Sequence, residues 1–542
     1  MADDCSVLIH GGTIVDGTGT PPMYGDLAVD GQTITGIHER GAVEGTVTID
    51  ATGMMVCPGF IDIHTHSDIS LLCCPLAESK IRQGVTTEVV GNCGWSAAPI
   101  VGRAGEPVSD VAEVYGVDVD WSSMDEYLLR LGLLGTSVNV ATYVGADTVR
   151  HGVIGAGDVK PTKDQMGCME ALVREAMADG AFGLSTGLIY APGCYASTEE
   201  IIGLASVTSP FEGLYSSHIR GEGSTLLRAV NEALRIGRKA CVRVQISHHK
   251  AAGVDNWGLV AESMRMIEHA RASGVDVAFD VYPYIASCTT LHSVLPPWVQ
   301  DGGKERILER MADPDLRERI KADLEDRNTR WENTIAEDSW ENIEVLGFRK
   351  EGNRRFERRR MTEVAEMLGR SPPDAAFDLM IEEGLGLMAI FHEMSEDDVV
   401  SVIRHPLSSI ASDGETGADY GPCREVPTHP RSFGTFPRAL RRYVFEKHVA
   451  SLEEMVRKMT SSPAARIGLT DRGVISEGMR ADIAVFDPET VRDEATFEEP
   501  YRYAHGMAFV LVNGVITIND GQHTKERAGV VLRKAPPAPR ER

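Results

Sequence analysis

Eight short apolar segments, most of them followed by a helical pattern, constrain the fold of this chain more than any other feature. Each reads as a buried strand, and amphipathic stretches such as residues 164–179, 224–238 and 257–271 separate most of them. Strand and helix alternating eight times is the pattern of a closed parallel barrel, so we expect an α/β fold built on a TIM-like (β/α)8 barrel. The expected strands are residues 55–63, 86–92, 138–144, 181–185, 213–217, 242–247, 275–281 and 408–412.

The two ends of the chain differ from the middle. Short β-branched runs alternate with glycine turns over residues 5–50, and the same texture returns over residues 481–486 and 509–515. We therefore expect residues 1–56 and 468–534 to form one small β-sandwich domain closed by both chain ends. The last residues, 535–542, are rich in proline and arginine and are expected to be disordered.

One interval interrupts the alternation of strand and helix. Residues 291–364 are dense in charge and contain amphipathic runs such as 316–324. We expect them to form an inserted helical subdomain, which leaves residues 57–290 and 365–467 as the catalytic barrel. Insertions after a barrel strand lie on the face that carries the active site, so this subdomain is expected to act as a lid.

Side chains that bind metals follow five of the expected strands. The first strand ends in His64-Thr65-His66, and side chains two apart on a strand face the same way, so both imidazoles can reach one point. Any one such residue alone would more often be a hydrogen-bonded histidine, a small buried cysteine or a turn aspartate. Together they predict Zn2+, in a two-metal site or as one tight ion with a second, weaker position. The six predicted ligands are His64, His66, Cys93, His218, His248 and Asp413.

The composition limits the partners. A formal net charge of −26 disfavours nucleic acid and anionic membranes, which select basic surfaces, and there is no run of about 18 apolar residues that would predict a transmembrane helix. Ten cysteines, two of them adjacent at Cys73 and Cys74, are expected to be reduced thiols rather than a disulfide framework. A cytoplasmic location follows from that expectation.

Seven short stretches also match a known pattern. They are Pro58–His66, Gly91–Gly94, Gly183–Leu188, Ser217–Glu222, Ser247–Lys250, Ser412–Gly414 and His429–Arg431. Together they resemble the D-aminoacylases, the N-acyl-D-amino-acid deacylases of the amidohydrolase superfamily. The resemblance extends over about residues 6 to 530, including both chain ends and the inserted segment.

The resemblance implies zinc-dependent hydrolysis of the amide bond of N-acyl-D-amino acids, giving a carboxylate and a free D-amino acid. It implies Cys93, His218 and His248 as the main zinc ligands, with the other three predicted ligands forming a weaker or second position. Zinc lowers the pKa of bound water to about 7, and Asp413 would act as general base and then as general acid. The implied partner is a small-molecule substrate, and we expect a monomer or a small homo-oligomer.

Two cations are implied as ligands of the substrate carboxylate. Lys250, two residues beyond a predicted zinc ligand on an extended strand, resembles the family's carboxylate-binding lysine. Arg431 resembles an arginine that reaches the substrate. At the end of the seventh strand, Tyr282 is preferred to Tyr284 as a substrate-binding tyrosine.

The substrate's side chain is less constrained. Ile189 and Met394 are candidates for the wall of its pocket, and their apolar character would favour D-Met, D-Leu or D-Phe derivatives. The loop at about residues 414–424 is longer than in typical members, which leaves open both the placement of Arg431 and the side-chain preference.

Alternative functions make different predictions. Hydantoinases bridge their metals with a carboxylated lysine on the fourth strand, and the strand ending at Ser185 has no lysine, but hydrolysis of cyclic amides or other N-acyl compounds stays open. Residues 183–187 fit the G-x-S-x-G pattern of serine hydrolases, yet Pro192 and Gly193 interrupt the helix that this motif requires. A non-catalytic scaffold is disfavoured because all six predicted ligands are present.

Overall fold

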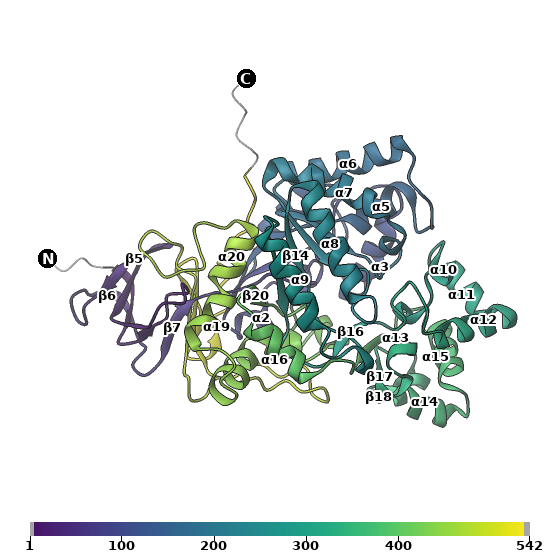
Figure 1. The fold of residues 1–542 in the computed structure, drawn as a ribbon. Coiled ribbons are helices and arrows are strands. Elements are labelled where there is room, and N and C mark those ends of the chain that lie inside the picture. Colours follow the sequence, from purple (N-terminus) through teal and green to yellow (C-terminus); the bar gives the residue numbers. More distant parts are fainter. Residues whose placement is uncertain (1–4, 536–542) are drawn as a thin grey trace, which may run out of the picture.

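The computed structural model describes residues 5–535 and has a closed barrel of parallel strands at its centre (Figure 1). Hydrogen bonding links β8, β9 and β10 in one sheet and β11, β12, β13, β14, β15 and β20 in another, and only Tyr143 separates β10 from β11. The expectation of eight barrel strands is therefore confirmed, with the third strand formed by β10 and β11 together. Their bounds are β8 Phe60–Asp62, β9 Val85–Val90, β10 Asn139–Thr142, β11 Val144–Gly145, β12 Gly183–Gly187, β13 Leu214–His218, β14 Arg243–Ile246, β15 Val277–Val281 and β20 Ser408–Ile410.

The ring closes between the first and the last barrel strands, at the ends where the predicted ligands lie. The backbone N–H of Asp413 donates to the carbonyl of His64 across 2.9 Å, and the N–H of His66 donates to that of Gly414 across 3.0 Å. Closure thus brings two ligand-bearing segments together although they lie about 350 residues apart in sequence.

Helices cover the outside of the barrel, since each presents one apolar face to the strands. In α8 the buried residues Leu226, Ala229, Val230 and Ala233 follow the spacing of a single helix face. These helices are α1 Ser70–Cys73, α2 Glu78–Ile81, α3 Gly105–Tyr115, α4 Met124–Leu134, α5 Ala146–Ile154, α6 Lys163–Ala178, α7 Thr198–Thr208, α8 Leu226–Ala240, α9 Val260–Ala272, α16 Glu396–Arg404, α17 Pro422–Glu425, α18 Arg431–Arg438 with its continuation η8 Ala439–Glu446, α19 Leu452–Met459 and α20 Ser461–Ile467.

The expected first strand, residues 55–63, is divided in two. β7 (Met55–Pro58) pairs with β21 and β2 in the small domain, and only β8 belongs to the barrel. The chain passes from one to the other at Gly59, where an added Cβ would lie 2.2 Å from Oγ1 of Thr86. One apolar run therefore serves two sheets, which periodicity alone could not indicate.

Two sheets made from both chain ends form the small domain at one end of the molecule (Figure 1). One has the order β5-β4-β1-β6, and the other has the order β24-β23-β22-β21-β7-β2-β3. Their apolar side chains share one cluster, as expected for a sandwich. The strands are β1 Cys5–His10, β2 Thr13–Ile14, β3 Met23–Tyr24, β4 Asp26–Asp30, β5 Thr33–His38, β6 Gly45–Asp50, β21 Ile483–Phe486, β22 Met507–Val512, β23 Val515–Asn519 and β24 Gln522–His523.

The last segment that was expected in the sandwich lies against the barrel instead. Val140 of β10 donates its N–H to the carbonyl of Val530 across 3.0 Å, and Leu532 donates to Val140 across 2.7 Å. This edge of β10 is open because β12 pairs with β11, so the C-terminal segment satisfies its backbone groups. The expected disorder of residues 535–542 concerns a stretch of which 536–542 lie outside the described residues.

The inserted segment follows β15 and forms a separate lobe, at the opposite end of the molecule from the sandwich (Figure 1). It contains an antiparallel sheet of order β16-β19-β17-β18 besides its helices, and its apolar core runs from Leu291 to Phe391, past the expected end at residue 364. The other domain limits stay predictions. Its elements are β16 Ser287–Thr290, η5 Leu291–Val294, α10 Pro297–Gln300, α11 Lys304–Ala312, α12 Pro314–Glu325, α13 Thr334–Glu337, η6 Trp340–Asn342, β17 Ile343–Leu346, η7 Glu351–Phe356, β18 Arg359–Arg360, α14 Met361–Leu368, α15 Pro372–Glu382 and β19 Met388–Phe391.

The expectation that the cysteines are reduced is wrong for one pair. Cys74 and Cys423 form a disulfide across 349 residues of sequence, and it joins the end of α1 to α17. Sequence spacing could not reveal this pair, because only the folded barrel places the two segments side by side. Among residues 5–535, no helix combines the length and the apolar character needed to cross a membrane.

Candidate metal centre

The six predicted ligands lie together at the carboxyl ends of the barrel strands. His64 and His66 follow β8, Cys93 follows β9, His218 is the last residue of β13, His248 follows β14 and Asp413 follows β20. Five of the six side chains are buried, and that of His66 is partly exposed. The structure therefore brings the six predicted ligands together, and their role as metal ligands stays a prediction.

Two sets of ligand atoms can be distinguished. Those of His64, His66, Cys93 and Asp413 all lie within 4.8 Å of one another, and so do those of Cys93, His218 and His248. Cys93 belongs to both sets, because its sulfur lies 3.2 Å from Nε2 of His64 and 3.6 Å from Nε2 of His248. The arrangement has room for two metal positions that share one thiolate.

The surroundings of these side chains fit a metal ion. Among the described residues, neither ring nitrogen of buried His218 has a hydrogen-bond partner, although buried polar atoms are usually paired. Burial by itself would raise the pKa of Cys93, but the charge of His64 and the neighbouring histidines outweigh it and hold that pKa well below the ordinary value. An available imidazole nitrogen beside a thiolate is the donor chemistry that zinc prefers.

The backbone at three of the ligands is unusual. Cys93, His248 and Asp413 have φ angles of 51°, 35° and 51°, in the left-handed region that side chains other than glycine rarely adopt. Such conformations cost free energy and cluster at functional sites, where the surrounding structure enforces them. The fold thus stabilises strained turns in order to direct these side chains to one point.

Two carboxylates that contact the predicted ligands, Glu222 and Asp280, were not predicted from the sequence. Oε1 of Glu222 lies 2.9 Å from Nδ1 of His248, and Oδ1 of Asp280 lies 3.3 Å from Nδ1 of His64. Carboxylates in these positions fix the orientation of metal-binding imidazoles. A signal was present for Asp280, which is a carboxylate inside the buried strand β15. Glu222 carried no signal in the sequence apart from its place at the end of Ser217–Glu222, one of the stretches that carry the resemblance.

Both predicted carboxylate-binding cations border the site, and both are paired. Nζ of Lys250 lies 2.7 Å from each carboxylate oxygen of Glu222. Nη1 of Arg431 lies 2.7 Å from Oδ2 of Asp413. Although burial disfavours a charged lysine, Glu222 outweighs that effect and raises the pKa of Lys250, so the ammonium form is retained.

Tyr282 and Tyr284 differ in their surroundings, and the preference for Tyr282 as a substrate-binding residue stays a prediction. The hydroxyl of Tyr282 is buried and has no hydrogen-bond partner among the described residues, and the ring lies below both Lys250 and Arg431, 5.7 Å and 5.0 Å from their charged groups. The hydroxyl of Tyr284 instead donates to the carbonyl of Pro430 across 3.4 Å. Of these two tyrosines, Tyr282 lines the cavity above the ligands and Tyr284 does not.

A cavity of about 1090 Å³ opens over the ligands, between the barrel and the inserted lobe. Ile189 lines it as expected, next to Leu188 and Tyr190. Met394 does not: its side chain is buried in the barrel's apolar core, and the neighbouring Glu393 faces the cavity. Adjacent residues of an extended segment point to opposite sides, so Glu393 faces the cavity while Met394 faces the core.

Glu393 is also chemically unusual. Its Oε1 accepts a hydrogen bond of 2.6 Å from the Ser287 hydroxyl, and burial raises the pKa of this carboxyl to about 7. His249, beside a predicted ligand, is buried and bonded to the hydroxyl of Ser263 across 2.8 Å, so it belongs to the barrel wall and not to the metal centre.

Comparison with known proteins places the chain among relatives of the same length. Residues 47–518 match the model of the amidohydrolase family. A D-aminoacylase of Alcaligenes xylosoxydans xylosoxydans is 36% identical over 527 residues, which are 97% of this chain and 97% of the relative.

Solved structures agree over nearly the whole chain. An N-acyl-D-glutamate deacylase from Bordetella bronchiseptica, complexed with zinc and a phosphonate that mimics the tetrahedral intermediate of its reaction, has 33% identity and a TM-score of 0.81 over 98% of this chain and 100% of its own. A D-aminoacylase with a binuclear metal centre, described as activated by one metal and attenuated by the second, has 34% identity and a TM-score of 0.81 over the same shares. This chain therefore belongs to the amidohydrolase family and, within it, to the D-aminoacylases.

Proposed function

We propose that the protein hydrolyses the amide bond of N-acyl-D-amino acids, releasing a carboxylate and a free D-amino acid. The observation that carries the proposal is the meeting of two ligand sets at Cys93 directly beside the cations Lys250 and Arg431, at the floor of one cavity. The named activities of the similar D-aminoacylase and N-acyl-D-glutamate deacylase support the same reaction.

The residues that would hold zinc most tightly are Cys93, His218 and His248. The unpartnered nitrogens of His218 and the low pKa of Cys93 support this assignment. The remaining ligands, His64, His66 and Asp413, would form the weaker position. Zinc bound here supplies a Lewis acid for the amide carbonyl and makes an attacking water more acidic.

Asp413 is the proton carrier in this scheme. Its Oδ1 lies 3.3 Å from Nε2 of His64 and 3.0 Å from Nε2 of His66, at the edge of the ligand sets. Burial favours the neutral acid, but Arg431 and the histidines outweigh it and hold the pKa of Asp413 well below the ordinary value. The carboxylate is therefore ready to accept the proton of the attacking water and to pass it to the leaving amine.

Lys250, Arg431 and Tyr282 would bind the α-carboxylate of the substrate. Since Lys250 and Arg431 are already paired with Glu222 and Asp413, the substrate carboxylate would join or replace these partners. The hydroxyl of Tyr282, whose ring lies near both cations, has no hydrogen-bond partner among the described residues and can donate a further hydrogen bond. Charge-assisted bonds of this kind orient the amide toward the proton carrier.

The substrate's side chain would contact the apolar part of the cavity around Leu188 and Ile189. This favours N-acyl derivatives of D-Leu, D-Met or D-Phe over acidic ones. The inserted lobe contributes cavity residues such as Leu295 and Leu385, and we assign it the role of a lid.

The test is a panel of N-acetyl-D- and N-acetyl-L-amino acids, with hydantoins assayed beside them. We expect hydrolysis of the apolar D-derivatives, loss of activity after exhaustive chelation and recovery on adding zinc. Preference for an L-isomer, hydrolysis of hydantoins alone, or full activity after removal of all metal would contradict the proposal. A serine-directed fluorophosphonate should leave the rate unchanged.

A further inference from the structure

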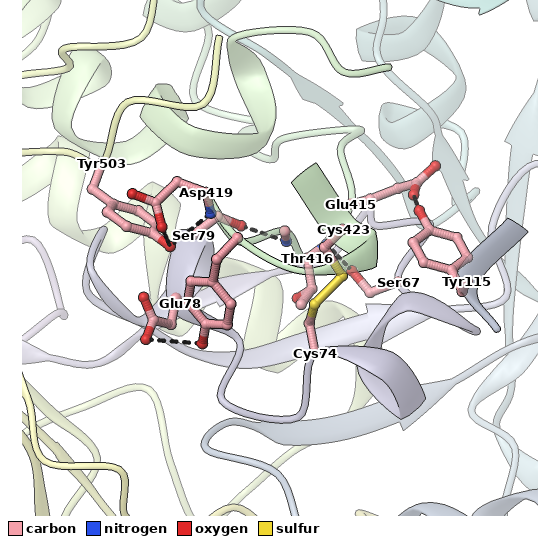
Figure 2. The surroundings of a disulfide bond; sticks show 12 residues. Ser67, Cys74, Glu78, Ser79, Tyr115, Glu415, Thr416, Asp419, Cys423 and Tyr503 are labelled. Atoms are coloured by element: carbon pink, nitrogen blue, oxygen red, sulfur yellow. Dashed lines mark hydrogen bonds between the residues drawn. A yellow bond between two sulfur atoms is a disulfide. The ribbon is translucent and has the colours of Figure 1, made fainter. Parts of the chain in front are cut away.

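Three cysteine sulfurs lie together outside the centre described above. The sulfur of Cys73 lies within 4.8 Å of those of Cys74 and Cys423, although it takes no part in the disulfide that joins the other two. Figure 2 shows the disulfide between the end of α1 and the short helix α17. The Cys73 thiol therefore lies beside the disulfide without being needed for it.

These sulfurs fasten the loop that leaves the proton carrier. The chain runs from Asp413 through residues 414–421 to Cys423. Along the way it is bonded to residues that follow the first barrel strand, such as Ser67, which Figure 2 shows beside Thr416. The N–H of Thr416 donates to the Ser67 hydroxyl across 2.7 Å, and the N–H of Gly417 donates to that of Ser79 across 2.9 Å. The cysteines therefore fix the far end of a loop whose near end carries Asp413.

We propose that Cys73, Cys74 and Cys423 form a second thiolate metal site, which binds Zn2+ when the disulfide is reduced. The site exists in two forms, a disulfide and a zinc trithiolate, and either form ties the loop after Asp413 to α1. The inference does not depend on the proposed reaction, because it concerns ligands that the catalytic scheme does not use.

The geometry suits zinc. With Zn–S bonds of about 2.3 Å and tetrahedral angles, two bound sulfurs lie about 3.8 Å apart, inside the 4.8 Å that encloses this trio. Thiolates are soft donors and select zinc over magnesium or calcium, and a water molecule can take the fourth position. Cys73 and Cys74 are half-buried, so the site can be reached from solvent, whereas Cys423 is buried.

The conversion between the two forms is balanced. Tris(2-carboxyethyl)phosphine breaks the S–S bond, is oxidised to its phosphine oxide with the oxygen of one water molecule, and leaves both sulfurs as thiols. Zinc then displaces the protons of the three thiols, which makes its binding stronger as the pH rises. In a reducing compartment, where thiols are kept reduced, the zinc form would be the relevant one.

The experiment measures zinc per chain in the full-length enzyme. Oxidised and phosphine-reduced samples are incubated with excess zinc sulfate, desalted and analysed by atomic emission. We expect the reduced enzyme to carry about one additional zinc ion per chain, as for a single site. With cadmium in place of zinc, the same sample should gain thiolate-to-metal absorption in the ultraviolet.

Matched variants locate the extra ion. Cys73→Ser removes the third ligand but leaves the disulfide pair, so the gain on reduction should fall at least tenfold. Cys168→Ser changes an exposed cysteine elsewhere and should keep the full gain. An equal zinc content in oxidised and reduced wild-type enzyme would overturn the proposal, and so would a gain that survives in Cys73→Ser. The wild-type comparison decides the question even if a variant fails to fold.

Discussion

Arg431 and Asp413 form a buried ion pair, with 2.7 Å between Nη1 of the guanidinium and Oδ2 of the carboxylate. The other carboxylate oxygen of Asp413 lies 3.0 Å from Nε2 of His66. One carboxylate thus connects the histidines that are predicted to bind metal with the arginine that is proposed to bind the substrate. A substitution of either residue should therefore also affect the other one, and variants of each residue separate the role of Asp413 from that of Arg431.

Replacing Asp413 by asparagine should remove the proton carrier while the side-chain shape is kept. We expect kcat to fall by about 10²- to 10⁴-fold, the usual size of a general acid–base contribution. Zinc at the tighter position should remain, since Cys93, His218 and His248 are unchanged. Asp419→Asn, an exposed change on the same loop, is the control and should leave kcat unchanged. Wild-type kcat in Asp413→Asn would remove Asp413 from this role.

Replacing Arg431 by methionine should weaken substrate binding more than chemistry. The loss of one charge-assisted contact, worth about 1.5–3 kcal/mol, predicts a rise in KM of about 10- to 100-fold. Arg424→Met removes an exposed arginine of α17 and should not change KM. The steady-state constants for an N-acetyl-D-amino acid decide the matter, and an unaltered KM would show that Arg431 does not bind the substrate.

The two ligand sets should differ in affinity. Cys93→Ala affects both sets, whereas His64→Asn affects only the weaker one, so we expect the cysteine variant to lose more zinc. His249→Asn is a matched control, because that buried histidine bonds to Ser263 and not to the metal ligands. Metal analysis after dialysis gives the order directly. Greater zinc loss in His64→Asn than in Cys93→Ala would reverse the assignment.

Glu222 contacts a predicted metal ligand and a predicted substrate-binding residue at once, with 2.9 Å to Nδ1 of His248 and 2.7 Å to Nζ of Lys250. Glu222→Gln keeps the shape but removes the charge, so it should lower zinc affinity by about 10- to 100-fold and raise KM as well. Glu262→Gln, on the exposed face of α9, should change neither. If zinc affinity and KM both stay at wild-type values, Glu222 does not position these two residues.

Glu393 predicts a pH dependence of stability. Burial raises its pKa from 4.5 to about 7, so folding favours the neutral acid. Its contribution to stability is fully present below pH 4.5 and is lost as the pH rises through 7, by about 3 kcal/mol in total at 1.36 kcal/mol per pKa unit. Glu393→Gln removes this loss.

Urea unfolding at several pH values tests the prediction for Glu393. The glutamine variant should be more stable than wild type near pH 8, and the difference should shrink toward pH 5. Ser287 is present in the wild type and in the variant, so its hydroxyl, which donates to Glu393 across 2.6 Å, can donate to the side-chain amide oxygen of the introduced glutamine instead. A stability difference that does not vary with pH would rule out this titration.

Much of the architecture follows from local pattern. The strands that end near His64, His218 and His248 are short, largely buried runs, and parallel strands in a barrel must all end on one rim. For this reason the six ligands could be placed together before any contact was known. The resemblance then assigned roles that pattern alone does not distinguish.

Other features depend on which residues meet in space. Met394 was expected in the pocket wall, but the adjacent residue, Glu393, lies there instead. The alternation of side chains along an extended segment does not predict which of its two faces an irregular segment turns toward the cavity. The roles of Glu222 and Asp280 could be inferred only from the structure, because they depend on the contacts of these carboxylates with His248 and His64.

The sequence by itself determined the barrel, the rim of ligands and the family, because strand periodicity and short motifs are local properties of the chain. Only the tertiary structure decided that Cys93 lies between two ligand sets, that Arg431 pairs with Asp413 and that Cys74 reaches Cys423. These are contacts between segments far apart in sequence, and they exist only once barrel closure and helix packing have fixed the distances between strand ends.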